Sequence, residues 1–304
     1  MGHTSKTITQ PDSTVHKNCL VTGGAGFIGT NLIDKLLAEG HNVVSVDNYS
    51  TGKHANEING CNYLLYDIRN SEFYNGLADI VSFKPDIIFH MAALPRIQPS
   101  FKNPVEVTEV NVLGTLNVLE YARMHNIPVI YAGSSSFHSG KFKNPYTFSK
   151  WQGEELCKMY KAIYDVQLSI CRFYNVYGNY MINEGNYRTV LSVFLEQHQT
   201  NKSLTITGDG EQRRDFTHVE DIVNALVNCM YEKVYGHVFE LGRGKNYSIN
   251  EIAEMFGGEK VYISRPKGEA QDTLCTAKEA RHFLKWEPKI NVGEWINDIC
   301  NNRD

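Results

Sequence analysis

The chain has 304 residues, of which 42% are hydrophobic and 21% charged, and its formal net charge is −4 at pH 7. This composition is typical of a globular protein of one or two lobes, and the slight acidity argues against a nucleic-acid-binding surface. No apolar run approaches the ~18–20 residues of a membrane span, so we expect no membrane partner. The seven cysteines lack Cys-x-x-Cys spacing, which argues against a disulfide framework or metal site and favours a reducing, cytoplasmic setting.

Short apolar runs alternate with helical patterns from residue 18 onward. The polar segment before them, residues 1–16, lacks the apolar centre of a signal peptide, and we expect a flexible tail there. Strands are predicted over 18–24, 42–47, 61–67, 86–93 and 128–136, and helices over 27–40, around 78–81 and over 107–126. Strand–helix alternation at this rhythm predicts an α/β fold, with a doubly wound parallel sheet covered by helices on both faces.

The rhythm loosens in the second half of the chain. Strands are predicted over 168–178 and 237–242, a helix over 187–199, and short helices from 248 to 300. The second half therefore returns to the sheet before it ends. We expect one domain from 17–172 plus about 214–242, and a smaller, interleaved lobe from 173–213 plus about 243–304.

A glycine-rich turn joins the first strand to the first helix. Gly23, Gly26 and Gly29 stand at G-x-x-G-x-x-G spacing, which suits a tight turn, close approach of a pyrophosphate and close helix–strand packing. The helix N-terminus adds free N–H groups and a positive dipole end. Asp47 ends the second strand, where a carboxylate binds ribose hydroxyls and repels a 2′-phosphate. The pattern predicts NAD rather than NADP, with Asp67 at the third strand end as a candidate adenine contact.

The segment KNPYTFSK, residues 143–150, holds a tyrosine and a lysine four positions apart. Asn144 fits an N-cap and Pro145 the first helical position, so Tyr146 falls in the first turn and shares a face with Lys150. Taken alone, such a pair fits a solvated helix surface as well as a proton-handling site. A neighbouring ammonium favours the phenolate, and a tyrosine pKa close to the working pH makes an efficient general base.

The motifs TGGAGFIG, DNYSTG, YDIRN, HMAA, YTFSK, RFYNVYG and GDGEQRRDF follow one another along the chain. In this order they resemble the extended short-chain dehydrogenase/reductase family. The chain is most similar to its NAD-dependent nucleotide-sugar epimerases and dehydratases, nearest the UDP-glucose and UDP-N-acetylglucosamine 4-epimerases. The resemblance covers residue 17 to the end. It implies a Rossmann-type NAD-binding domain, a lobe that binds a UDP-sugar or related nucleotide sugar, and a homodimer packed through residues 107–125 and 146–164.

The resemblance also implies roles at matching positions. The catalytic residues are Ser134, Tyr146 and Lys150, with Tyr146 as the base that takes the proton of the sugar 4-hydroxyl. The cofactor-binding residues are Gly23, Gly26, Phe27, Ile28, Asp47, Asn48, Asp67, Ile68, Ala92, Ala93, Asn111, Tyr146 and Lys150. The substrate-binding residues are Ser100, Ser135, Ser136, Asn175, Arg214, Arg265, Glu269 and Leu274. No metal is implied. The segment around Arg265 has one more residue before Gly268 than the family pattern.

The residues between Ser136 and Tyr146 bear on which reaction follows oxidation at C4. Dehydratases of the group that the chain resembles carry an Asp-Glu pair just after the strand serine or threonine, and decarboxylating relatives carry a glutamate there. Here the segment is FHSGKFKNP, without a carboxylate, and His138 can supply only one of the two groups that an elimination needs. The segment is about half the usual length in the family. An acid or base supplied from elsewhere in the chain therefore remains an alternative. Leu274, where some epimerases carry tyrosine, leaves room for an N-acetyl group.

These observations favour an NAD-dependent 4-epimerase of a UDP-hexose or UDP-N-acetylhexosamine, acting through a transient 4-keto sugar. A 4,6-dehydratase or 4-ketoreductase of the same family is the alternative. A non-catalytic NAD-binding protein is a third hypothesis, against which the complete set of Ser134, Tyr146 and Lys150 argues.

Overall fold

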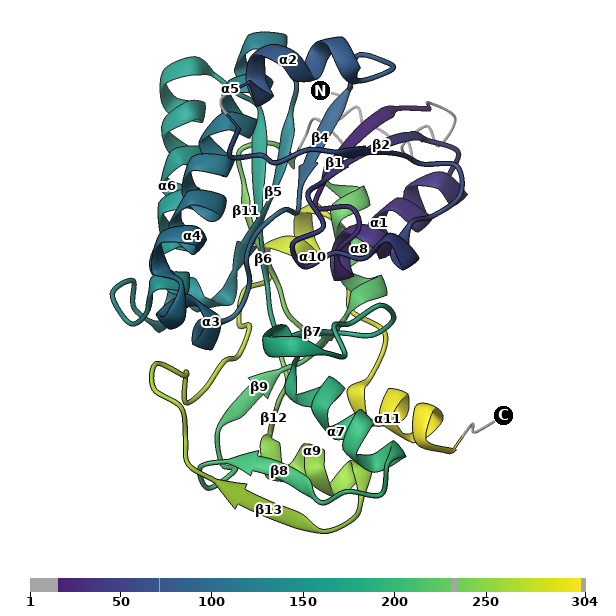
Figure 1. Ribbon diagram of the computed structural model, residues 1–304, viewed down its shortest axis with the longest axis vertical. Helices are drawn as coiled ribbons and strands as arrows, with labels where there is room; N and C mark the ends of the chain where they lie inside the picture. The colour runs from purple at the N-terminus through teal and green to yellow at the C-terminus, as the bar shows by residue number, and fades with distance from the viewer. Residues whose placement is uncertain (1–15, 71, 231–233, 302–304) are drawn as a thin grey trace, which may run out of the picture.

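The computed structural model describes residues 16–70, 72–230 and 234–301, and within them the core is a seven-stranded sheet (Figure 1). The strands are β1 (Asn18–Thr22), β2 (Asn42–Asp47), β3 (Asn62–Leu65), β4 (Ile87–His90), β5 (Val129–Ser134), β6 (Leu168–Phe173) and β11 (Val238–Leu241). All neighbours pair in parallel. Every residue of β5 is buried, which explains its unbroken apolar pattern. The predicted doubly wound sheet is confirmed, whereas the tail expected over 1–16 lies, except for residue 16, outside the described residues.

The strand order, β11-β6-β5-β4-β1-β2-β3, reverses next to β1. The chain moves outward from β1 through β2 to β3, and then returns to β4 on the other side of β1. In open parallel sheets, ligands bind beyond the carboxyl ends of the strands at such a reversal. The glycine-rich turn after β1 and the segment after β4 both lie at this point.

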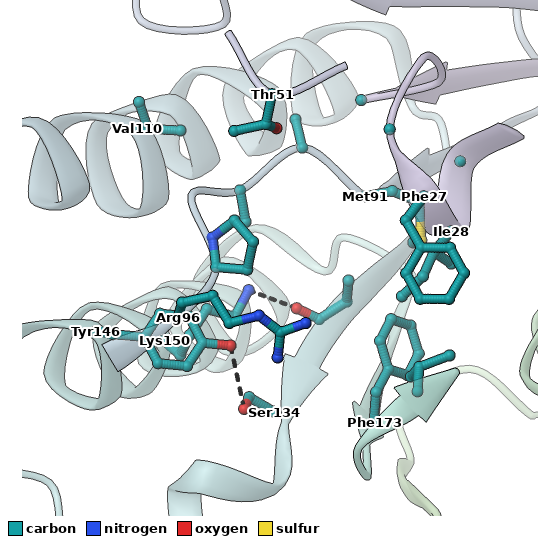
Figure 2. Close-up of a pocket in the computed structure, with 18 of the residues that line it drawn as sticks. Phe27, Ile28, Thr51, Met91, Arg96, Val110, Ser134, Tyr146, Lys150 and Phe173 are labelled. Carbon is teal, nitrogen blue, oxygen red and sulfur yellow. Dashed lines mark hydrogen bonds between the residues drawn. The ribbon is translucent and has the colours of Figure 1, made fainter. Parts of the chain in front are cut away.

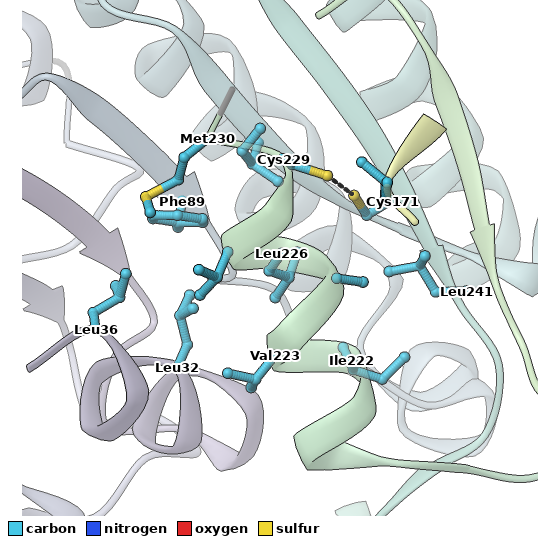
Figure 3. Packing of buried hydrophobic residues seen from close by; sticks show 14 of the residues in the cluster. Leu32, Leu36, Phe89, Cys171, Ile222, Val223, Leu226, Cys229, Met230 and Leu241 are labelled. Carbon is cyan, nitrogen blue, oxygen red and sulfur yellow. Dashed lines mark hydrogen bonds between the residues drawn. The ribbon is translucent and has the colours of Figure 1, made fainter. Parts of the chain in front are cut away.

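Helices cover both faces of the sheet (Figure 1). One face carries α1 (Phe27–Ala38), α8 (Val219–Asn228) and α10 (Glu279–Phe283), and the other carries α2 (Phe73–Ile80), α5 (Thr115–His125) and α6 (Pro145–Tyr164). Figure 3 shows Leu32 and Leu36 of α1 in one apolar cluster with Leu226 of α8 and Phe89 of β4, all four fully buried. Burial of such apolar surface stabilises the packed layers by about 25 cal/mol per Å².

The helix predicted over 107–126 is divided into three parts. It begins as α4 (Pro104–Thr108), continues as the π-helical segment η2 (Glu109–Gly114) and ends as α5, with Asn126 in the left-handed conformation after it. A π-helical turn inserts an extra residue per turn and is frequent at functional sites. Apolar periodicity does not reveal such a turn, because the helix axis and its buried face persist through it. The turn carries the buried Asn111.

A third apolar cluster, separate from the two at the sheet, forms the lower part of the molecule in Figure 1. It lies among α7 (Val190–Gln199), α9 (Ile249–Phe256), α11 (Val292–Asn301) and small strand pairs. The pairs are β7 (Val176–Tyr177) with β10 (Thr217–His218), β8 (Leu204–Thr207) with β13 (Lys260–Ile263), and β9 (Arg213–Asp215) with β12 (Asn246–Ser248). The remaining short elements are α3 (Ile97–Lys102), η1 (His54–Asn56), η3 (Ser135–Ser139) and η4 (Gly185–Tyr187). None of the helices among the described residues is long and apolar enough to cross a membrane.

Candidate active site

A pocket of about 340 Å³ opens at the strand reversal. It is lined by the turn after β1, by the ends of β2 and β5, by the segments after β3 and β4, by α6 and by Phe173 at the end of β6. Further lining residues are Asn175, Val176, Ile182, Arg214, Glu269, Ala270 and Thr273. Residues far apart in sequence therefore meet in one cavity, whose lining includes glycines, carboxylates, hydroxyl groups and cationic groups.

The glycine-rich turn is held by close backbone contacts. Gly23 has a φ of +72°, and a Cβ there would lie 2.7 Å from the backbone of Ala92. A Cβ on Gly29 would lie 2.1 Å from the carbonyl oxygen of Gly23, so the turn cannot carry a larger residue at either position. The N-cap of α1 is Gly26, which supplies no side-chain acceptor, and the first turn of α1 has no acidic residue. The first N–H groups of α1 therefore face the pocket without a side-chain cap, which suits an anionic ligand.

Two carboxylates stand at the ends of β2 and β3. The Asp47 carboxylate is 8% exposed and accepts the backbone N–H groups of Ala25, at 2.9 Å, and Tyr49, at 2.7 Å, while burial raises its pKa. Asp67 accepts Nδ2 of Asn48 at 3.0 Å and a bidentate pair of hydrogen bonds from Arg69, which lower its pKa to about 2. Asp47, Asn48 and Asp67 all line the pocket, as do the predicted cofactor contacts Phe27, Ile28, Ile68, Ala92 and Ala93.

Tyr146 and Lys150 project from the first two turns of α6 toward Ser134 at the end of β5 (Figure 2). The predicted cap is present, because Asn144 Oδ1 accepts the backbone N–H of Thr147 at 2.8 Å and Pro145 is the first helical residue. Tyr146 Oη donates to Ser134 Oγ at 3.3 Å. Lys150 is 5% exposed, donates to the carbonyl oxygen of Ala132 at 2.5 Å and lies 4.4 Å from the ring centre of Tyr131.

Burial perturbs both titrating groups of this constellation. It raises the pKa of Tyr146, while the hydrogen bond with Ser134 and the positive charge of Arg96 act in the opposite direction. Burial lowers the pKa of Lys150 to about 8, against the influence of Glu154 one turn later. Burial disfavours the charged phenolate of Tyr146. A cationic ligand next to the phenol would act in the opposite direction, because an opposite charge nearby favours the phenolate.

Asn111 and Ser100, two residues predicted to contact ligands, are hydrogen-bonded to the first turns of α6. Asn111 donates through Nδ2 to Ser149 Oγ at 3.0 Å and to the carbonyl oxygen of Leu94 at 3.1 Å, and accepts the backbone N–H of Leu94. Ser100 is fully buried, and its Oγ accepts the backbone N–H of Tyr146 at 3.1 Å. Neither side chain lines the pocket, so both act by positioning the first turns of α6.

His138 lies outside the pocket lining and binds Glu240. Its Nε2 lies 2.8 Å from Glu240 Oε1 on β11. Arg172 binds the same carboxylate oxygen at 2.7 Å and forms a bidentate pair with the buried Glu154. A network that spans β6, α6 and β11 therefore occupies His138, which cannot serve as the second acid or base of an elimination from this position.

The pocket lining also includes most of the predicted substrate contacts. Ser135, Ser136, Asn175, Arg214 and Glu269 line it, and Ser136 Oγ is buried with no hydrogen-bond partner among the described residues. Arg214 NH2 lies 3.7 Å from Glu269 Oε2. Besides Ser100, two predicted substrate contacts lie outside the lining. Arg265 is exposed and binds Gln271 and the carbonyl oxygen of Ala270, and Leu274 is 42% exposed.

Arg96, at the start of α3, lines the pocket and was not among the residues singled out from the sequence. No motif signals it, because its place in the site depends on a backbone angle that sequence does not disclose. Across the described ranges there is no group of three or more His, Cys, Asp or Glu side chains able to hold a metal ion.

Residues 19–242 match the family described as the NAD dependent epimerase/dehydratase family, and the chain belongs to it. Its cofactor is NAD. A curated relative from Methanocaldococcus jannaschii, a putative UDP-glucose 4-epimerase, is 33% identical and covers 93% of this chain and 97% of its own. A UDP-N-acetyl-alpha-D-glucosaminuronate decarboxylase from Bacillus cytotoxicus is 32% identical over 78% of both chains. The solved UDP-glucose 4-epimerase of Thermotoga maritima, with UDP-glucose, superposes with a TM-score of 0.88 at 28% identity, covering 93% of this chain and 97% of that one.

The residues at the strand reversal fit NAD. The uncapped N-terminus of α1 and the glycines before it can hold a pyrophosphate, and Asp47 stands where a ribose hydroxyl can donate to a carboxylate. NAD bound there supplies the acceptor for a hydride.

Proposed function

We propose that this protein is an NAD-dependent nucleotide-sugar 4-epimerase whose substrate is a UDP-hexose or a UDP-N-acetylhexosamine. The observation that carries the proposal is the pairing of Tyr146 with Ser134 in a pocket whose carboxylates are all engaged elsewhere. Asp47 accepts backbone N–H groups, Asp67 binds Arg69, and Glu269 accepts Nε2 of Gln98 at 3.1 Å and lies near Arg214.

An elimination or a proton transfer at C5 needs an acid and a base besides the group at C4. None of the three lining carboxylates is hydrogen-bonded to Tyr146 or Ser134 in the described part of the chain, and His138 is bound to Glu240. A site with one proton-transfer group at C4 suits a reaction that removes hydride from C4, giving a 4-keto sugar, and returns it to the opposite face of the same carbon. That reaction inverts C4 and consumes no reductant.

In this proposal Tyr146 takes the proton of the 4-hydroxyl and later gives it back. Ser134, at 3.3 Å from the phenol, orients the hydroxyl hydrogen bond. The Lys150 ammonium, 4.4 Å from the ring centre of Tyr131, supplies a positive charge on the same face of α6 as Tyr146. A general base of matched pKa contributes ~10²- to 10⁴-fold to rate. Arg214, Asn175, Ser135 and Ser136 all line the pocket. In this proposal Arg214 and Asn175 would hold the diphosphate of the substrate, and Ser135 and Ser136 would contact the sugar.

The test is to incubate the protein with UDP-, dTDP- and GDP-linked hexoses, hexuronates and N-acetylhexosamines and to identify products by NMR. The 4-epimer of the added sugar, formed without net NADH, is the expected product. Tyr146→Phe should lose at least 10²-fold in kcat while NAD binding, followed by NADH fluorescence titration, stays within about twofold. A 4-keto-6-deoxy product, loss of CO₂, or full activity of Tyr146→Phe would contradict the proposal.

A further inference from the structure

Arg96 adopts a backbone conformation that L-residues avoid. Its φ is +85° and its ψ is 140°, a region populated almost only by glycine. Such a conformation costs of order 1–3 kcal/mol and persists only where the surroundings enforce it. Strained residues of this kind gather at ligand-binding sites, so the side chain that the strain positions is a candidate functional group.

The strain points the Arg96 side chain into the pocket. Figure 2 shows its side chain next to Tyr146, and both residues line the pocket with Ser134. Its Nε donates to the carbonyl oxygen of Tyr187 at 3.0 Å, which fixes the plane of the group. Among the residues that the structure describes, this is its only hydrogen bond, and it forms no ion pair. The two terminal nitrogens therefore remain available to a ligand.

Charge balance in the pocket is unusual around this guanidinium. Burial lowers the pKa of Arg96, and the groups that interact with it electrostatically are Tyr146 and Glu269. Glu269, however, is hydrogen-bonded to Gln98 and lies 3.7 Å from Arg214, which already balances its charge. A partly buried cation without a partner anion is costly, whereas a planar guanidinium whose two terminal NH2 groups are both free can bind a carboxylate bidentately.

The position of Arg96 selects which anion it can bind. Arg214 comes from β9 in the lower part of the molecule, on the side from which the nucleotide enters under the proposed function. Arg96 instead neighbours Tyr146, the group that acts on the sugar ring. A carboxylate carried by the sugar itself, next to the reacting carbon, is the ligand group within its reach.

We propose that Arg96 is a specificity-determining residue that binds an anionic substituent of the sugar, which makes a nucleoside-diphosphate hexuronate the preferred substrate class over the neutral hexose. This inference rests on the proposed function for the identity of Tyr146 as the group at C4. It keeps the reaction at C4 of the proposed function but replaces its neutral sugars by an acidic one. It also adds a residue that the glycine-rich and Tyr-x-x-x-Lys motifs do not include.

Arg96 also favours the phenolate of Tyr146 through its charge, and this second effect must be separated from substrate recognition. Both a neutral and an anionic sugar depend on the same phenol. The effect on Tyr146 therefore cancels in the ratio of kcat/KM for UDP-glucuronate to kcat/KM for UDP-glucose, and only the interaction with the carboxylate changes this ratio.

The experiment compares the wild type, Arg96→Gln, Arg96→Lys and the control Lys102→Gln with both substrates. Lys102 is exposed at the end of α3, so its replacement removes the same charge outside the pocket. We expect the wild-type ratio to exceed 10. Arg96→Gln should lower it by about 10- to 100-fold, because a hydrogen-bonded charge pair contributes about 1.5–3 kcal/mol and each 1.4 kcal/mol is tenfold. Arg96→Lys should retain part of the preference, and Lys102→Gln should keep it within twofold.

Calorimetric binding of the same two nucleotides to the NAD-loaded proteins supplies a readout that needs no turnover. A selective loss of UDP-glucuronate binding in Arg96→Gln supports the inference even if no epimer forms, in which case only the proposed reaction fails. A wild-type preference for UDP-glucose, or equal losses for both nucleotides in Arg96→Gln, would overturn the role of Arg96 and leave the epimerase proposal intact.

Discussion

Replacement of Lys150 by methionine should stabilise the protein at neutral pH while it abolishes activity. Lys150 is 5% exposed, and burial lowers its pKa from the ordinary value of 10.5 to about 8. Below pH 8 the ammonium is charged in both the folded and the unfolded chain. The full pKa difference then counts against folding, by about 3 kcal/mol.

Part of this cost is offset by contacts that methionine lacks. The ammonium donates to the carbonyl oxygen of Ala132 and lies over the ring of Tyr131, and these contacts contribute about 1–2 kcal/mol together. Methionine keeps an unbranched stem of similar length, so Lys150→Met leaves no large cavity. The expected net gain in the free energy of unfolding is about 1–2 kcal/mol at pH 7.

The gain should depend on pH in a defined direction. Between pH 8 and 10.5 the unfolded chain holds the Lys150 proton more tightly than the folded chain, so wild-type stability rises with pH in this window. The advantage of Lys150→Met should disappear near pH 10.5. Urea unfolding of cofactor-free wild type, Lys150→Met and the exposed control Lys158→Met, at pH 7 and pH 10, measures it. A variant less stable than wild type at pH 7, or an equal difference at both pH values, would refute the reasoning.

Three further substitutions test the packing and the buried charges around the site. Gly29→Ala should destabilise the protein by at least about 2 kcal/mol and weaken NAD binding, since its Cβ would meet the Gly23 carbonyl oxygen at 2.1 Å; Gly76→Ala, in an α2 position with open space, should instead add about 0.5–1 kcal/mol. Equal thermal shifts for the two glycine variants would contradict this. Arg172→Met should cost about 3–5 kcal/mol in urea unfolding at pH 7 because it leaves the fully buried Glu154 unpaired, and a loss below 1 kcal/mol would show that Glu154 finds another partner.

The sequence predicted what depends on local pattern. Apolar runs and glycine spacing located the parallel sheet and the turn after β1, and the Asn-Pro pair located the start of α6. The pocket brings together most of the predicted contacts, because motifs at strand ends converge at the reversal of a parallel sheet.

Features that depend on residues distant in the sequence could not be predicted from the sequence. His138 is bound to Glu240, 102 positions away, and the Ser100 hydroxyl accepts the backbone N–H of Tyr146, 46 positions away. The π-helical turn at Asn111 preserves the buried face of its helix and leaves no mark in the apolar periodicity. Arg96 was missed because its place in the pocket depends on a φ of +85°, and the residues next to it in the sequence do not predict that angle.

The packing of α1 against α8 has a consequence for how the protein is made. Leu36 and Leu226 share one buried cluster, yet 190 residues separate them along the chain (Figure 3). At a synthesis rate of ~5–20 residues per second, the apolar side of α1 waits roughly 10–40 s for its cover. During that interval the nascent chain exposes the apolar side of α1 and an incomplete sheet. We therefore expect ribosome-associated chaperones to bind α1 early in synthesis. Slower translation between α1 and α8 would lengthen the time for which α1 needs them.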